Sequence, residues 1–329
     1  KNCICRGVRH MQLMVSRSQP ILNRKPPFDA SIIPYCRHIT KRADLSDRFL
    51  CRADRLYEFS AILFPPVTLD GGGGVLMAEF GRALAECGAK VALLDINEKA
   101  AQEVAASIGE NAIGIGTNCL VKDSILAARD IIHEKWGKVN FLINGAGGNN
   151  PKATCDNETM TPDLEGAKDF FALDESGLKF VFDLNITSAF LTTQVFAKDM
   201  VKTGGNIINI SSMNAYRPLT KIPAYSAAKA GISNFTQWLA VHFAPCNIRC
   251  NAIAPGFFVT NQNRALLFNE DGTPTARTGK ILAATPMKKF GEVSDLIGAL
   301  LWLSDDNASG FVTGTVIPVD GGFSAYSGV

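Results

Sequence analysis

Three residues in the middle of the chain, Ser212, Tyr225 and Lys229, have the types and spacing that proton transfer requires. Tyr225 and Lys229 are four residues apart, so on a helix they share one face, and Ser212 follows the apolar stretch at 207–210. A free phenol has a pKa of about 10, but a nearby ammonium group favours its ionised form. The trio therefore suits proton transfer to or from an alcohol or carbonyl oxygen. A Tyr-x-x-x-Lys spacing also occurs by chance in helices, so the surrounding sequence is needed to decide whether this pair is functional.

Short apolar segments alternate with helical segments from about residue 67 onward. The expected strands cover residues 91–95, 112–117, 139–144, 206–211, 249–254 and 315–319, and the expected helices cover residues 78–87, 100–107, 124–136, 186–200, 225–243 and 294–304. This alternation is typical of an α/β fold with a doubly wound parallel sheet (Rossmann-type) covered on both faces. Ligands bind such sheets beyond the carboxyl ends of the strands, where we expect Asp95, Asn144, Ser212 and Pro255 to lie together.

Four consecutive glycines precede the first clear helix. Glycines at 71–74 would let the backbone approach a pyrophosphate that the helix N-terminus then holds. Asp95 closes the next strand, twenty-four residues after Gly71, where an acid can accept hydrogen bonds from the ribose hydroxyls and repel a 2′-phosphate. A flexible turn and an ordinary loop acid are the alternatives. The order of strand, glycines, helix, strand and acid favours a dinucleotide site, with NAD preferred over NADP.

Bulk composition excludes several classes of protein. The net charge is only +2, which does not favour nucleic acid as a partner. The four His residues lie far apart and the nine Cys contain no Cys-x-x-Cys pair, so no metal site is expected and a reduced, cytoplasmic setting is favoured. No apolar run approaches the roughly 20 residues of a membrane span, so no membrane partner is expected.

Residues 1–66 differ from residues 67–329, which we expect to form one domain. They hold twelve Lys or Arg, five Asp or Glu and four of the nine Cys, with no sustained helical or strand period. An organelle transit peptide would be poor in acids, and a nucleic-acid-binding arm would cluster its charges. We therefore favour a third interpretation, in which this irregular basic extension is a non-native leader.

Four motifs in the right order make residues 67–329 resemble the short-chain dehydrogenase/reductase family. They are Asn-Gly-Ala-Gly at 144–147, the Ser, Tyr and Lys above with Asn185 before them, Asn-Ala-Ile-Ala-Pro-Gly at 251–256 and Asp-Gly-Gly at 320–322. The resemblance implies a catalytic tetrad of Asn185, Ser212, Tyr225 and Lys229, with Asn185 kinking its helix and holding a water that connects Lys229 to solvent. It also implies a homotetramer or dimer. The implied cofactor-binding residues are Gly71, Gly72, Gly73, Gly74, Val75, Leu76, Asp95, Asn118, Asn144, Ala146, Gly147, Tyr225, Lys229, Pro255 and Gly256.

Within that family, three loops resemble those of bacterial D-mannonate oxidoreductases, also called fructuronate reductases. They cover residues 147–154, 211–221 and 255–264. The resemblance implies NAD(P)-linked interconversion of an alcohol and a ketone on a sugar acid, with D-mannonate and D-fructuronate favoured. A carboxylate and several hydroxyls need fixed polar partners. The candidates are Asn149, Lys152, Asn214, Arg217, Asn261 and Arg264.

Two other functions remain open from the sequence. One is a dehydrogenase for another polyol or hexonate, such as gluconate. The other is a non-catalytic or regulatory Rossmann-fold protein with impaired cofactor binding. This second alternative rests on departures from the family's glycine motif, in which Asp70 replaces Thr and Met77 replaces Gly. We expect the Asp70 carboxylate to lie where phosphates should lie, and we expect Pro65 and Pro66 to break the strand before the glycines.

Overall fold

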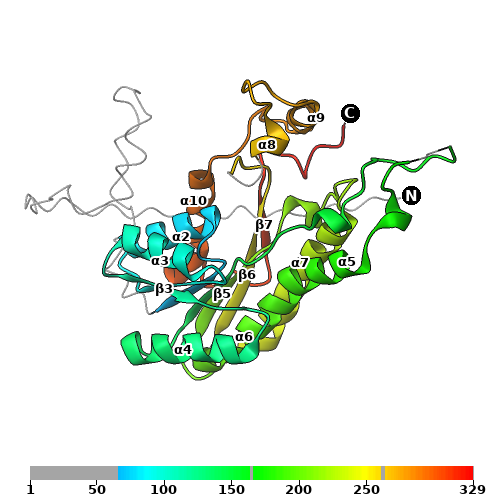
Figure 1. Cartoon of the computed structure of the whole chain (residues 1–329). Coiled ribbons are helices and arrows are strands. Elements are labelled where there is room, and N and C mark those ends of the chain that lie inside the picture. The colour runs from blue at the N-terminus through cyan, green and yellow to red at the C-terminus, as the bar shows by residue number, and fades with distance from the viewer. Residues whose placement is uncertain (1–65, 164–165, 261–263, 329) are drawn as a thin grey trace, which may run out of the picture. The chain divides into compact units, whose positions relative to one another are not determined.

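The computed structural model describes residues 66–163, 166–260 and 264–328, and in them seven parallel strands form one sheet in the order β3-β2-β1-β4-β5-β6-β7 (Figure 1). The strand order reverses between β1 and β4, which places a crevice at the carboxyl ends of those two strands. The doubly wound parallel sheet predicted from the sequence is confirmed. The strands are β1 (Val67–Asp70), β2 (Val91–Asp95), β3 (Ala112–Gly116), β4 (Phe141–Asn144), β5 (Gly205–Ile210), β6 (Ile248–Pro255) and β7 (Val316–Val319).

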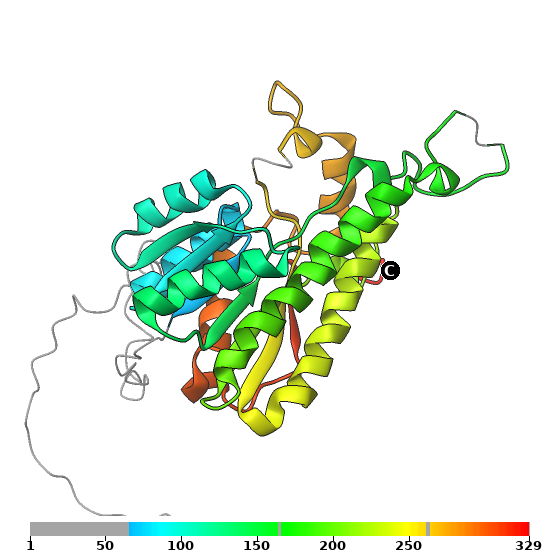
Figure 2. The same ribbon diagram turned by 60° about the horizontal axis from the view of Figure 1, so that its bottom comes forward.

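Helices cover both faces of the sheet because neighbouring strand residues point to opposite sides. Leu93 packs with one core against α2 (Val75–Glu86), α3 (Glu98–Ile108) and α10 (Ile297–Ser304). Leu94 packs with the other core against α4 (Lys122–Trp136), α6 (Ser188–Met200) and α7 (Pro223–Phe243). Figures 1 and 2 show these two helical layers on either side of the strands. The remaining helices are α5 (Glu175–Phe182), α8 (Arg264–Leu267), α9 (Ala276–Ala284) and α11 (Asp306–Ser309).

A buried strand precedes the glycines, so the expectation that Pro66 would break it is wrong, and Pro65 lies outside the described residues. β1 begins at Val67, directly after Pro66, and pairs with β2 at Val91 and with β4 at Phe141. The missing N–H of Pro66 falls just outside the hydrogen-bonded ladder, and the N–H of Val67 donates to Lys90 O at 2.8 Å. A buried strand of four residues is therefore compatible with the proline before it.

A continuous helical run from Glu175 to Met200 carries α5, a π turn at Asp183–Thr187 and α6. The sequence predicted a helix only from residue 186, because residues 148–180 lacked a clear period. The run has the length and hydropathy of a membrane-crossing helix, but half of its most apolar window is buried within the protein. Packing of α6 against α4 and the sheet explains its apolar composition.

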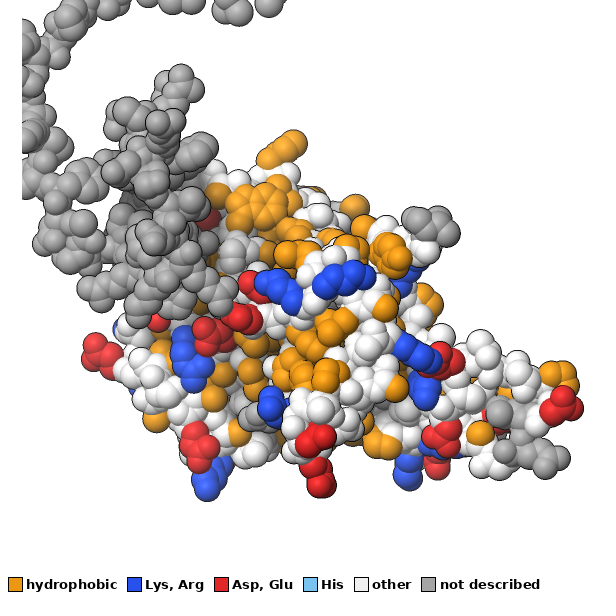
Figure 3. All heavy atoms as spheres, turned by 90° about the horizontal axis from the view of Figure 1, so that it is seen from above, with side chains coloured by type: hydrophobic (Ala, Val, Ile, Leu, Met, Phe, Trp, Pro, Cys, Tyr) orange, Lys and Arg blue, Asp and Glu red, His pale blue; other side chains and the backbone are white. Residues whose placement is uncertain are grey.

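Two segments extend from the carboxyl ends of the strands. The connection between β4 and α5 contains only the short 3₁₀ turns Pro151–Ala153 and Phe170–Ala172 in its described part, and α8 and α9 follow β6 (Figure 1). Figure 3 views the molecule from above and shows hydrophobic side chains gathered with lysine and arginine side chains on that face.

Candidate active site

Ser212, Tyr225 and Lys229 come together at the carboxyl end of β5. Ser212 follows the strand and caps a short 3₁₀ turn, and α7 begins at Pro223, which places Tyr225 in its first turn. The Ser212 hydroxyl is hydrogen-bonded to the Tyr225 phenol. The Lys229 Nζ lies 5.7 Å from the centre of the Tyr225 ring and donates to Ile210 O at 2.8 Å. The predicted trio is therefore assembled in one place.

Burial shifts the pKa values of two members of this trio, Tyr225 and Lys229. It raises the pKa of the Tyr225 phenol above its ordinary value, and the hydrogen bond with Ser212 opposes that shift. Burial also lowers the pKa of Lys229 to about 8, which Asp70 partly opposes. The expectation that Lys229 would hold the Tyr225 pKa below its usual range is therefore wrong for this structure, whose resting form is the neutral phenol.

Asn185 lies in the π turn and connects it to the turn after β4. Its Nδ2 donates to Val181 O and to Gly148 O, each at 2.8 Å, and its Oδ1 accepts from Gly148 N at 3.2 Å. Asn185 is almost fully buried. The predicted distortion of the helix at Asn185 matches the π turn, whereas the predicted bound water remains a prediction.

The turn between β1 and α2 has the shape that a dinucleotide phosphate needs. Gly71 has a φ of +68°, and a Cβ on Gly72 would lie 2.7 Å from the Leu93 side chain. Helix α2 starts at Val75 without a side-chain cap and without an acid in its first turn, so its N-terminal N–H groups are open to an anion. These residues fit a nicotinamide dinucleotide.

Asp95 stands beside this turn, as the sequence predicted. Its Oδ2 accepts from Gly73 N at 3.0 Å, and its Oδ1 accepts from Asn97 N at 2.8 Å. The carboxylate is therefore held at the end of β2, next to the glycines. In this position it can accept hydrogen bonds from ribose hydroxyls and repel a phosphate.

Asp70 does not face the phosphate position, which corrects the expectation from the sequence. Its carboxylate is fully buried and accepts from the backbone N–H groups of Gly145 and Ala146. Met77 is also buried, and its thioether packs where a Cβ on Gly145 would be. Both departures from the family motif thus pack against the turn after β4 instead of entering the cofactor cradle.

The remaining predicted cofactor residues border the same crevice, although two amide side chains bind the protein itself. Asn144 Nδ2 donates to Thr193 and Asn209, and Asn118 Oδ1 accepts from Leu120 N at 2.9 Å. Gly256 follows β6, where a Cβ would overlap Asp320. The others, which lie at the ends of β4 and β6 and at the start of α2, are Ala146, Gly147, Pro255, Gly74, Val75 and Leu76.

The predicted substrate residues have different surroundings. Asn214 is buried directly beyond Ser212, and its Oδ1 has no hydrogen-bond partner. Arg217 is exposed, with its Nε donating to Ser324 O at 3.2 Å. Lys152 forms a loose ion pair with Asp174 at 3.9 Å. The other three are Asn149, which donates to Thr154, Arg264, which lies over the Phe268 ring, and Asn261, which is outside the described residues.

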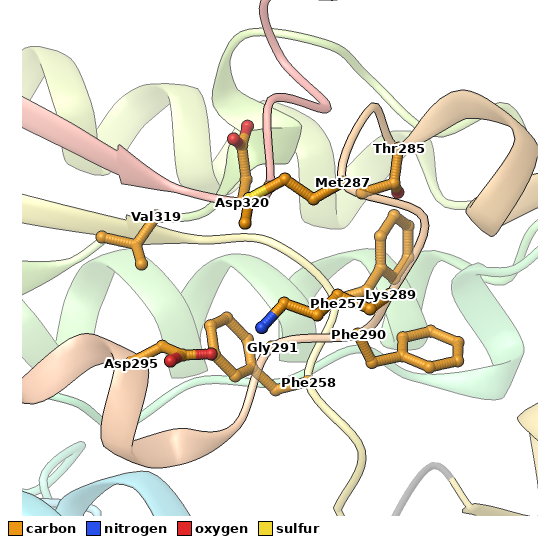
Figure 4. Close-up of a pocket in the computed structure, with 11 residues that line it drawn as sticks. Phe257, Phe258, Thr285, Met287, Lys289, Phe290, Gly291, Asp295, Val319 and Asp320 are labelled. Atoms are coloured by element: carbon orange, nitrogen blue, oxygen red, sulfur yellow. The ribbon is translucent and has the colours of Figure 1, made fainter. Parts of the chain in front are cut away.

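Two pockets lie near the carboxyl ends of β6 and β7. One of about 240 Å³ is bounded by the segment after Gly256, by residues 285–291 and by the end of β7 (Figure 4). The second, of about 280 Å³, is lined by Arg217, Phe323 and Tyr326 among others. Residues 285–291 were not among the predicted site residues, because only the return of the chain to Phe258 and β7 brings them there. Among the described residues, no group of His, Cys, Asp and Glu could hold a metal ion.

Comparison with known proteins adds independent information about this site. The family model described as enoyl-(acyl carrier protein) reductase matches residues 78–324. An uncharacterized oxidoreductase from Haemophilus influenzae is 59% identical over 268 residues, covering 80% of this chain and 94% of that protein. The 2-dehydro-3-deoxy-D-gluconate 5-dehydrogenase of Escherichia coli is 31% identical over 245 residues, covering 74% of this chain and 88% of that protein.

A crystal structure with bound NAD is also similar. It is provisionally described as a D-mannonate oxidoreductase from Haemophilus influenza and has a TM-score of 0.78 at 57% identity, covering 80% of this chain and 96% of that chain. At this identity and coverage, the two chains share one fold.

Proposed function

This chain belongs to the short-chain dehydrogenase/reductase family, and we propose that it is an NAD-dependent oxidoreductase for a sugar acid. It interconverts a secondary alcohol and a ketone, with D-mannonate and D-fructuronate as the favoured pair. The observation that carries the proposal is the contact between Ser212, Tyr225 and Lys229 beside a glycine turn open to phosphate.

The resting protonation state assigns roles in catalysis. The nicotinamide supplies or accepts the hydride when it is bound. In reduction, the Tyr225 phenol donates its proton to the carbonyl oxygen, and Ser212 holds that oxygen in place by a hydrogen bond. In oxidation, Tyr225 must first lose its proton, which its raised pKa disfavours at neutral pH. The Lys229 ammonium lies close enough to the ring to favour the phenolate once it forms.

Asp95 supports NAD as the cofactor in preference to NADP. Its carboxylate is fixed by the N–H groups of Gly73 and Asn97, so it cannot turn away from a 2′-phosphate without losing both hydrogen bonds. The similar crystal structure contains NAD. A preference for NAD follows from this charge at the end of β2.

A sugar acid suits the polar groups near Ser212. The Asn214 Oδ1 is buried without a partner, which is costly unless a ligand hydroxyl donates to it. The Arg217 guanidinium, anchored through Nε to Ser324 O, borders a pocket of about 280 Å³ and can bind a carboxylate. Gluconate and other hexonates present the same groups, so they remain the second candidate substrates, as the similarity to a dehydrogenase of a deoxygluconate also indicates.

Turnover of a panel of hexonates and hexuronates with NAD or NADH tests this function. We expect D-mannonate to give the highest kcat/KM, and Tyr225→Phe to lower kcat at least about 10²-fold while NADH binding persists. Ser226→Ala, on the same helix, is the matched control and should retain activity. Near-normal turnover by Tyr225→Phe would contradict the assigned proton donor, and no turnover of any sugar acid would contradict the substrate class.

The exposed face of α6 and α7 supports self-association. Phe190, Trp238 and Val241 are 41%, 55% and 79% exposed, which is unusual for such large apolar side chains so close together. A second copy of the chain is the proposed occupant of this face, giving a dimer or tetramer. A cytoplasmic location is proposed on the described cysteines, which are all free thiols.

A further inference from the structure

Asp70 is a buried carboxylate that the proposed reaction does not use. It ends β1, is fully buried, and accepts hydrogen bonds from Gly145 N and from Ala146 N, the latter at 2.8 Å. Its Oδ2 has no hydrogen-bond partner. Burial raises the pKa of Asp70 to about 6, whereas the two N–H groups and Lys229 favour the ionised form.

In the described part of the chain, Lys229 is the main charged neighbour of Asp70. Lys229, on α7, is the positive charge that acts on Asp70, and Thr192 from α6 is uncharged, with its hydroxyl donating to Asn144 at 2.6 Å. Cys119, between β3 and α4, is neutral because burial raises the pKa of its thiol far above the usual range. Asp70 in turn raises the pKa of Lys229, against the larger effect of burial. Each group therefore favours the charged form of the other.

The backbone that Asp70 binds is also the backbone beside Lys229. Gly147 follows Ala146 directly, and a Cβ on Gly147 would lie 3.0 Å from Lys229 Nζ and 2.7 Å from Asn185 Oδ1. The position of this turn therefore sets the space around two residues of the predicted tetrad. Asp70 holds this turn at its first two residues, because its carboxylate accepts hydrogen bonds from Gly145 N and Ala146 N.

We propose that Asp70 is a positioning residue of the active site, whose carboxylate fixes the turn at 145–147 and keeps Lys229 an ammonium ion. The proposal rests on the proposed function, because it concerns the same site. With the carboxylate ionised, Lys229 carries its charge across neutral pH in spite of its burial. Without the carboxylate, Lys229 releases its proton at a lower pH and no longer favours the Tyr225 phenolate.

Substitution of Asp70 by Asn separates charge from hydrogen bonding. The Asn side chain keeps an oxygen that can accept from Gly145 and Ala146, but it cannot ionise. Lysine labelled with ¹³C at Cε reports the Lys229 titration by NMR in the full chain, with the resonance assigned through Lys229→Arg. The matched control is Asp130→Asn, which removes an exposed carboxylate on α4.

We expect the Lys229 titration midpoint to fall by about one pH unit in Asp70→Asn and to stay unchanged in Asp130→Asn. In the unsubstituted protein, the Lys229 resonance should show a second inflection near pH 6, where Asp70 ionises. In Asp70→Asn, the alkaline limb of the pH profile of kcat should move to lower pH together with the Lys229 midpoint. A purely structural role for Asp70 would change stability but not this midpoint.

A Lys229 midpoint in Asp70→Asn within about 0.3 pH units of the original overturns the proposal. If Asp70→Asn does not fold, Asp70→Thr provides the second variant, since Thr also lacks the charge. If neither folds, the inflection near pH 6 in the unsubstituted protein decides, and its absence overturns the proposal. Because the titration needs no substrate, it remains decisive even if no sugar acid is turned over, a result that would contradict only the proposed function.

Discussion

Replacement of Gly147 by Ala should damage the active site without damaging the fold. The φ of Gly147 is negative, so Ala is tolerated by the backbone, but its Cβ would lie 2.7 Å from Asn185 Oδ1 and 3.0 Å from Lys229 Nζ. Asn185 cannot move away freely, because it makes three hydrogen bonds to Gly148 and Val181. Loss of two of them costs about 2 kcal/mol, which corresponds to about a thirtyfold loss of kcat/KM.

Gly148→Ala is the matched control for this prediction, since its Cβ would meet only Leu184 Cδ2 at 3.6 Å, an ordinary contact. Both variants are compared by kcat/KM for the best sugar acid, by NADH fluorescence titration and by thermal unfolding. We expect the Gly147 variant to lose activity and the Gly148 variant to keep it, with Tm values that differ by only a few degrees. Equal activities would refute the argument that the turn after β4 sets the position of Asn185 and Lys229.

Three further outcomes follow from buried and charged groups. Asp95→Ala removes the acceptor of Gly73 N and should weaken NADH binding about tenfold. It should also reduce the preference for NADH over NADPH, as measured by fluorescence titration with each of the two cofactors. Asp199→Ala removes the partner of His133 Nε2 at 2.6 Å and should cost about 2 kcal/mol, seen as a Tm lower by about 4–8 °C. Because burial raises the pKa of Asp70 from 3.8 to about 6, its contribution to stability is present below pH 3.8 and is lost as the pH rises through 6. The unfolding free energy from urea titration, taken as the original protein minus Asp70→Asn, should therefore be about 3 kcal/mol lower at pH 7.5 than at acidic pH. A difference between the two proteins that does not change with pH would contradict this.

The sequence predicted the sheet well because its strands are short apolar runs between helical segments. The expected strand at 91–95 has the same bounds as β2, and the other five expected strands differ from theirs by at most two residues at either end. β1 was misjudged because Pro66, directly before it in sequence, lies outside the ladder. Helix α5 was missed because five of its eight residues are exposed and its apolar period is short.

The sequence predicted which residues meet in the candidate site more accurately than it predicted their protonation states. The spacing of Tyr225 and Lys229 placed both on one helix face, and their contact with Ser212 is present. Protonation states could not be predicted in the same way, because they depend on burial by residues far apart in sequence. The orientation of Asp70 likewise depends on β4, which pairs with β1 from more than seventy residues away.

Buried amide side chains explain why helix α7 holds one position against the sheet. Asn144 Nδ2, on β4, donates to Thr193 on α6 at 3.0 Å and to Asn209 Oδ1 on β5 at 2.7 Å, and Asn209 Nδ2 donates to Thr236 on α7 at 2.9 Å. Hydrophobic packing is non-directional and would allow a helix to slide along the sheet. A buried hydrogen-bonded chain does not, because a shift leaves a donor unsatisfied at a cost of about 1–3 kcal/mol. Since α7 also carries Tyr225, the polar chain that begins at Asn144 fixes the Tyr225 phenol at the strand ends through four elements of the fold.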